Sequence, residues 1–121
     1  MENKYNQIFA SRTKALAVKV INNLSDVPYS DKVSVIRKQI FRSTTSVAAN
    51  YRAMCRARSD KEKYAKICIV VEEADESVFW LEIIEEINMV SKEITEGLMK
   101  EALEILKVTS AYKSRLKIKA E

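Results

Sequence analysis

Only two of the 121 residues, Pro28 and Gly97, belong to the residue types that most often interrupt regular secondary structure. A β-sandwich, a β-barrel or a doubly wound sheet needs many turns, and glycine and proline supply a large share of them. Apolar residues make up 47% of the chain and charged residues 31%, which is enough apolar material to fill one core. These features predict a few long helices in one domain spanning residues 1–121.

Apolar side chains recur at steps of three and four residues in four stretches, the spacing of one helix face. We expect Ile8 to face inward in the first stretch, and Pro28 ends that stretch because proline disfavours helical geometry just before it. Ser30 and Ser59 are expected N-caps, and Glu62 completes a capping box with Ser59. We predict helices over residues 4–24, 31–57, 60–88 and 92–116, followed by a frayed tail.

The second stretch has the most regular apolar stripe of the four. Thr44 falls on this stripe, and hydrogen bonds to the facing helix would account for the Ser, Thr and Asn residues between 43 and 50. Gly97 lies inside the fourth stretch, where it either admits a neighbouring backbone or is a tolerated defect. The stripe consists of Val33, Ile36, Ile40, Thr44, Val47, Tyr51 and Met54 or Cys55.

Four amphipathic helices with short connections pack most simply as an antiparallel up-down-up-down bundle. The expected fold class is therefore all-α, a four-helix bundle. The longest unbroken apolar run, Ile67 to Val71, is five residues, against the roughly 20 that span a bilayer, so we expect no membrane contact. The first ten residues show no basic segment followed by an apolar stretch, so we expect no signal peptide and a cytoplasmic protein.

The absence of histidine excludes much of the common chemistry of enzymes. Most hydrolytic triads need an imidazole base, structural zinc needs about four Cys or His ligands, and haem and di-iron bundles use histidine as well. Cys55 and Cys68 are the only cysteines, and we expect both to be reduced thiols. The acidic residues between 72 and 86 are expected to pair with Arg and Lys. We therefore predict no catalytic residue, no metal and no cofactor.

Charge is distributed unevenly along the chain. Residues 30–58 carry seven basic side chains and one acidic side chain, whereas residues 59–90 carry three basic and nine acidic side chains. Three interpretations of the basic stripe stay open: a solvated or intrachain-paired face, a contact with the acidic helix of another subunit, and a surface that binds nucleic-acid phosphates. For the third interpretation the candidate residues are Lys38, Arg42, Arg52, Arg56 and Arg58.

The third stretch is apolar around more than one face, because Phe79, Trp80, Ile83 and Ile87 extend its stripe. A helix that is apolar on most sides is buried on most sides, and a helix of a four-helix bundle keeps one open side. These four residues therefore predict an oligomer interface, where aromatic side chains are enriched. The other interpretation places Trp80 in the core of its own protomer and leaves Phe79 half exposed.

Two segments are similar to a known family. The sequence from Thr44 to Arg52 with the turn at residues 56–60, and the sequence from Glu73 to Glu82, resemble the signatures of the four-helix-bundle proteins encoded in 23S rRNA intervening sequences. The resemblance covers about residues 5–115 and implies a homopentamer with no known enzymatic activity. The accessory protein of diversity-generating retroelements looks like a basic relative, and its association with nucleic acid implies a binding role for Arg52, Arg56 and Arg58.

Two functional hypotheses follow. The first is a non-enzymatic, homo-oligomeric helical bundle that binds structured RNA or DNA through the basic face of the second helix. Its contacts would be to phosphates, so binding should depend steeply on salt and weakly on sequence. The alternative is a protein-interaction scaffold whose basic and acidic helices pair between subunits, with no role in nucleic-acid binding.

Overall fold

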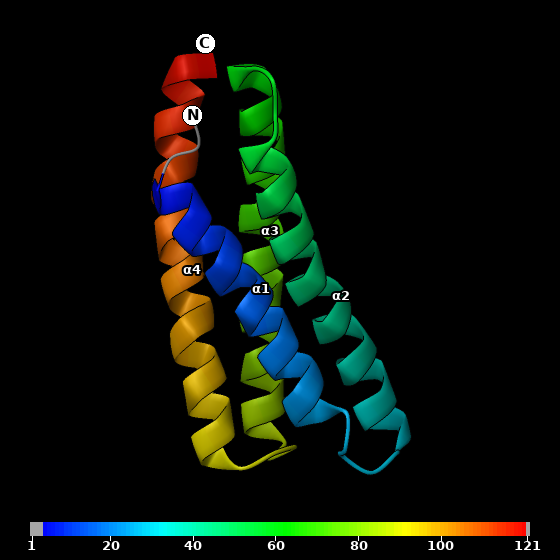
Figure 1. Ribbon diagram of the computed structural model, residues 1–121. Helices are drawn as coiled ribbons and strands as arrows, with labels where there is room; N and C mark the ends of the chain where they lie inside the picture. The colour runs from blue at the N-terminus through cyan, green and yellow to red at the C-terminus, as the bar shows by residue number, and fades with distance from the viewer. Residues whose placement is uncertain (1–3, 121) are drawn as a thin grey trace.

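The computed structural model describes residues 4–120. The chain forms four helices, α1 (Lys4–Leu24), α2 (Asp31–Cys55), α3 (Asp60–Glu86) and α4 (Lys92–Ala120). Successive helices run in opposite directions and pack side by side (Figure 1). This arrangement confirms the predicted antiparallel four-helix bundle. α2 ends two residues before its predicted end, and α4 continues four residues past its own.

α1 lies obliquely across the other helices. Its first turns lie beside α4 and its last turns beside the start of α2 (Figure 1). The contact of α1 with α2 is more extensive than its contact with α4, and within residues 4–120 the backbone of α1 does not approach that of α3. Because α1 is tilted, the bundle has a groove on one side of this helix and a pocket on the other, both described below.

Ser30 and Ser59 cap α2 and α3 as the sequence predicts, but the Glu62 carboxylate accepts from the Arg58 amide, at 2.8 Å, in place of the Ser59 amide that a capping box uses. The Ser30 hydroxyl accepts a hydrogen bond from the Val33 amide at 3.2 Å, and the Ser59 hydroxyl accepts one from the Glu62 amide at 3.1 Å. Such caps stabilise a helix by about 0.5–2 kcal/mol each. They fix where α2 and α3 begin, and therefore which α2 side chains face α3.

Asn88 ends α3 in the left-handed backbone region, with a φ of 53°. Its amide donates to the Glu85 carbonyl oxygen, and the Met89 amide donates to the Ile84 carbonyl oxygen. These two bonds form a Schellman motif, which satisfies carbonyl groups left open at a helix end. Asparagine tolerates this conformation better than most side chains, so the turn can form without glycine.

The core lies along the inward faces of all four helices. The stripe predicted for α2 is buried from Val33 to Met54. In α1 the prediction for Ile8 is wrong, because this side chain is 43% exposed and Phe9 takes the inward position. Ile8 lies one position before the series of α1 residues that face the core. This series is Phe9, Thr13, Leu16, Val20 and Leu24. Thr13 is accommodated in the core because its hydroxyl donates to the Phe9 carbonyl oxygen at 2.7 Å.

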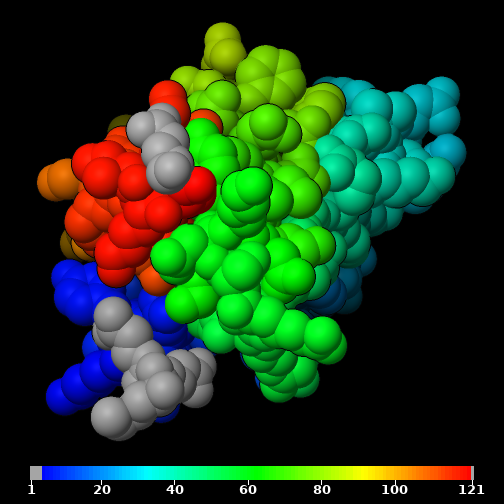
Figure 2. Space-filling model, turned by 90° about the horizontal axis from the view of Figure 1, so that it is seen from above, coloured from blue at the N-terminus to red at the C-terminus, as the bar shows by residue number. Residues whose placement is uncertain are grey.

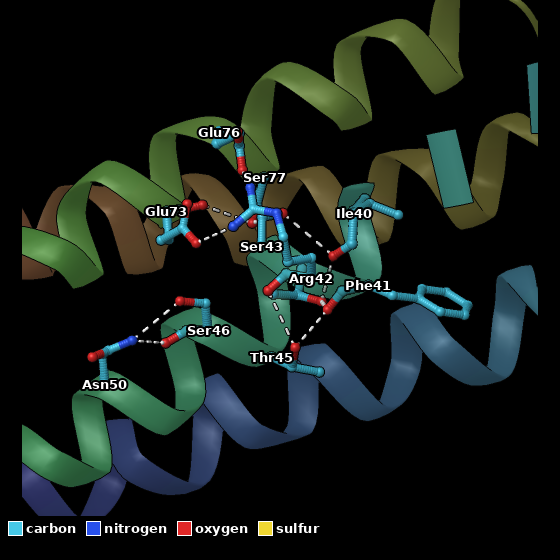
Figure 3. A network of polar contacts seen from close by, with 11 residues as sticks. Ile40, Phe41, Arg42, Ser43, Thr45, Ser46, Asn50, Glu73, Glu76 and Ser77 are labelled. Atoms are coloured by element: carbon cyan, nitrogen blue, oxygen red, sulfur yellow. Dashed lines mark hydrogen bonds and ion pairs between the residues drawn. The ribbon is translucent and has the colours of Figure 1, made fainter. Parts of the chain in front are cut away.

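A buried polar contact joins α2 to α3. The Ser77 hydroxyl lies 2.8 Å from Ser43 Oγ and 2.9 Å from the carbonyl oxygen of Glu73, and it can donate its one proton to either (Figure 3). The expectation that Thr44 forms such a bond is wrong, because its hydroxyl donates to Ile40 within the same helix. The polar run of α2 therefore does contribute a bond between helices, through the neighbouring residue.

Gly97 lies on an exposed part of α4, and a Cβ atom added there would have no atom of residues 4–120 within 4 Å beyond its chain neighbours and the backbone of its own helix. No neighbouring backbone uses the space, so this glycine is a tolerated defect. No helix between residues 4 and 120 combines the length and the hydropathy that crossing a membrane requires.

Candidate nucleic-acid interface

A groove of about 840 Å³ lies between α1 and α2, and we call it the α1–α2 groove. Four basic side chains line it, and none of the described residues that line it is acidic. The side chains between them are small, so a bulky anionic partner can approach the helix backbones closely. The basic lining residues are Lys14, Arg52, Arg56 and Lys63, and the alanines are Ala10, Ala17, Ala48, Ala49 and Ala57.

Arg52 and Arg56, two of the residues predicted from the sequence, lie together in this groove. Both side chains are exposed, and neither forms an ion pair within residues 4–120. The sequence did not indicate Lys14 and Lys63, because a basic stripe along one helix does not show which residues of other helices pack beside it. Lys14 comes from α1 and Lys63 from the first turn of α3. Only the packing of three helices brings the four cations to one groove.

Arg42 is directed toward α3 instead (Figure 3). Its Nη1 atom lies 2.6 Å from the Glu73 carboxylate, and its Nη2 atom pairs with Glu76. The intrachain interpretation of the basic stripe therefore holds for this residue. Half of the Arg42 side chain is exposed, so each pair contributes no more than about 1 kcal/mol to stability.

Three further basic residues, from α2 and the turn after it, do not line the groove. Lys38 and Arg58 are exposed and lie outside the groove lining. The Arg37 side chain donates to the carbonyl oxygens of Leu24, at 3.0 Å, and Val27, at 2.8 Å. Arg37 therefore holds the connection between α1 and α2, and its charge is directed at carbonyl groups that the end of α1 leaves open.

An ion pair fixes α1, which carries Lys14, against α4. The Arg12 guanidinium donates to both carboxylate oxygens of Glu101, at 3.0 Å and 2.6 Å. This hydrogen bonding lowers the pKa of Glu101 and raises the pKa of Arg12. The Arg12 side chain also lies over the Phe9 ring, 4.7 Å from its centroid. A bidentate pair of this kind restricts orientation as well as position, so it helps to hold α1 against α4.

The four residues predicted for an oligomer interface divide into two groups. Phe79 is 49% exposed. Trp80, Ile83 and Ile87 are partly buried and pack against the core of their own protomer. The Phe79 and Trp80 rings meet edge to face, with centroids 5.0 Å apart. The Trp80 indole nitrogen is buried and has no hydrogen-bond acceptor within residues 4–120. Phe79 is therefore the outermost member of the group.

Cys55 and Cys68 are not joined by a disulfide bond. No group of three or more acidic or cysteine side chains within residues 4–120 has the arrangement needed to hold a metal ion. The α1–α2 groove, with its four basic side chains, is therefore the candidate site for binding an anionic partner.

Comparison with known proteins places this chain in a family. The family model for 23S rRNA-intervening sequence proteins matches residues 6–111. The chain belongs to the 23S rRNA-intervening sequence protein family. No curated protein matches it.

A solved structure is similar to this member of the intervening-sequence family over most of both chains. It is the crystal structure of a protein with unknown function from the S23 ribosomal protein family of Bacteroides thetaiotaomicron VPI-5482. The two share 28% sequence identity with a TM-score of 0.81, and the match covers 90% of this chain and 97% of the other.

Proposed function

We propose that this chain is a non-enzymatic, homo-oligomeric helical bundle that binds structured RNA or DNA through the α1–α2 groove. The observation that carries the proposal is a groove lined by four cations and no described carboxylate. Arg52 and Arg56 keep the role predicted from the sequence, and Lys14 and Lys63 join them. Arg42 is no longer part of the set, because its charge is neutralised by α3.

The chemistry of the groove fits a phosphate backbone. Lysine and arginine neutralise phosphates and release condensed counterions, which gives affinity without reading base edges. The alanines that separate the cations leave room for a sugar-phosphate chain between α1 and α2. The exposed side chains of Lys38 and Arg58, on the same basic helix and the turn after it, add longer-range attraction.

The test is fluorescence anisotropy with a mixed-sequence RNA hairpin and a DNA duplex at low and moderate salt. We expect saturable binding at low salt that weakens as salt rises. The variant Arg52→Glu/Arg56→Glu should abolish binding, and the matched control Lys92→Glu/Lys100→Glu changes the net charge equally outside the groove. Binding that the two double variants reduce equally would refute the groove as the site, and no binding at low salt would refute the function.

The oligomeric part of the proposal rests on α3. Phe79 exposes half of its surface beside Trp80, and covering it with a second subunit would bury an aromatic side chain. Five subunits is the number that the family resemblance implies. Phe79→Glu should lower the mass measured by light scattering, whereas Ile118→Glu, at another exposed apolar position, should not. An unchanged mass for Phe79→Glu would refute this contact.

A second candidate function is a protein-interaction scaffold. It is favoured by the exposed carboxylates of Glu72, Asp75 and Glu82 along α3, which could enter the α1–α2 groove of another copy. This candidate predicts that Arg52→Glu/Arg56→Glu dissociates the oligomer and that the parent protein binds no nucleic acid. An oligomer that withstands this double variant would exclude it.

A further inference from the structure

A second hollow lies on the other side of α1. This pocket, of about 400 Å³, is formed by the first turns of α1, the C-terminal half of α4 and one residue of α2, and we call it the α4 pocket. It lies toward the end of the bundle that holds the start of α1 and the end of α4, which are neighbours in the view from above (Figure 2). Its volume is within the range of small-molecule sites. No residue lines both the α4 pocket and the α1–α2 groove.

α4 supplies the pocket with two adjacent rows of side chains at four-residue spacing, which places each row along one line of the helix surface. The inner row is apolar or aromatic, and the outer row is basic apart from one alanine. The inner row is Val108, Tyr112 and Leu116, and the outer row is Lys107, Ala111, Arg115 and Lys119. Ala111 leaves a gap in the outer row that opens the pocket to solvent.

Two further tyrosines, Tyr5 and Tyr51, and the buried amide of Asn6 complete the lining. Tyr51 is buried at the base of the pocket, and its hydroxyl lies 3.4 Å from Asn6 Oδ1. Burial raises the pKa of Tyr51 above its ordinary value. Tyr5 stacks on Phe9 at the mouth, and the Arg115 guanidinium lies over the Tyr112 ring, 5.5 Å from its centroid. Flat aromatic surfaces and a flat cation therefore share one small pocket.

The charged side chains that line the α4 pocket are all basic among the described residues. Lys107, Arg115 and Lys119 are exposed at its rim, and none of the described residues that line it is acidic. None of these three side chains forms an ion pair within residues 4–120. A ligand that contacted both the aromatic and the basic residues of the pocket would have a planar ring to pack on a tyrosine and a negative group to pair with the basic rim.

We propose that the α4 pocket binds a nucleoside monophosphate, either free or as an unpaired nucleotide of an RNA strand. The base packs against Tyr112, where aromatic side chains and arginine planes both stack on bases. The phosphate lies between Arg115 and Lys119, which provide a fork of donors and a point charge. This inference does not depend on the α1–α2 groove, because the two sites share no residue.

The test is calorimetry and amide NMR titration of the full chain with AMP, ribose 5-phosphate and adenosine. AMP should bind in the millimolar range or more tightly, with chemical-shift changes centred on Ala111, Tyr112 and Arg115. Ribose 5-phosphate, which lacks the base, should bind about 5- to 150-fold more weakly. Adenosine should also bind more weakly, because it lacks the phosphate. Equal affinities for AMP and ribose 5-phosphate, or no saturable binding of AMP, would overturn the proposal.

Variants separate this site from the groove. Arg115→Gln/Lys119→Gln changes exposed residues only, so it should keep the fold and weaken AMP binding at least tenfold. The matched variant Arg52→Gln/Arg56→Gln should leave AMP binding unchanged. A loss of AMP binding in the groove variant, with none in the α4 variant, would place the ligand elsewhere and refute the pocket.

A further arm distinguishes the two sources of the ligand. An RNA hairpin with one unpaired 3′ nucleotide is compared with its blunt counterpart. Tighter binding of the overhang, reversed by added AMP, would show that the pocket takes the end of a strand. AMP binding with equal affinity for both hairpins would show that it takes the free nucleotide. If the α1–α2 groove binds no nucleic acid, the AMP titration still tests the α4 pocket. The two proposals can therefore be refuted independently.

Discussion

The buried contact between Ser43 and Ser77 predicts an energetic coupling between α2 and α3. The two hydroxyls lie 2.8 Å apart, and each has a second partner within its own helix, Ile40 for Ser43 and Glu73 for Ser77. Truncating either serine to alanine therefore removes the bond between the helices without leaving the other hydroxyl wholly unpaired. The perturbation is the set of variants Ser43→Ala, Ser77→Ala and the double variant.

The expected magnitude follows from that geometry. One neutral hydrogen bond contributes about 1 kcal/mol net, and alanine regains a few tenths of a kcal/mol in helix propensity. Each single variant should lower the free energy of unfolding by about 0.5–1 kcal/mol. The double variant loses the same bond only once, so its destabilisation should be about 1 kcal/mol smaller than the sum of the two single variants.

The assay is urea unfolding followed by circular dichroism at a fixed protein concentration, since stability of an oligomer depends on concentration. A coupling within about 0.3 kcal/mol of zero is the additivity expected of independent sites. That result would refute the conclusion that this bond helps to hold α2 against α3.

Three further predictions follow from the structure. Gly97→Ala should raise the free energy of unfolding by about 0.5–1 kcal/mol, measured by urea denaturation, because the site is open and helical; a loss of stability would contradict the open environment. The folded pKa of Glu101 is lowered, so the stability from its pair with Arg12 is complete above the ordinary pKa of 4.5 and is lost as pH falls through the lowered value. Glu101→Gln should therefore lower the melting temperature at pH 7 and converge with the parent in acid, and a constant difference would contradict the pair. Arg42→Gln removes both ion pairs, so it should lower stability by no more than about 2 kcal/mol and leave RNA affinity within about twofold, whereas Arg52→Gln should weaken RNA binding; equal losses of affinity would show that Arg42 also contacts the ligand.

The fold could be predicted from the sequence because the helical repeat is strong and its interruptions are few. In α2 every predicted inward residue from Val33 to Met54 is buried. In α1 the prediction is wrong at Ile8, because Ile8 and Phe9 are adjacent large apolar residues and the helical repeat alone does not decide between them. The Phe9 ring contacts Tyr51 of α2, with centroids 6.5 Å apart, and that tertiary contact decides which of the two faces inward.

The candidate site could be predicted only in part, because charge in one helix does not show its partners. Arg42, Arg52 and Arg56 share one stripe of α2, yet the first pairs with α3 and the others face the groove. The distinction depends on the register of Glu73 and Glu76 against α2, which follows from the turn and from core packing. The contribution of Lys14 depends on the tilt of α1, and the repeat within α1 carries no information about that tilt.

The salt dependence of nucleic-acid binding tests the central claim most directly. Four phosphate contacts per groove predict a slope of about −3.6 in log K against log salt for duplex DNA, or about a 150-fold loss of affinity from about 50 to about 200 mM salt. Arg52→Gln/Arg56→Gln removes two of the four cations, so the slope should fall to about −1.8. A slope near zero for the parent protein, or a slope that this double variant leaves unchanged, would contradict a groove that binds phosphates.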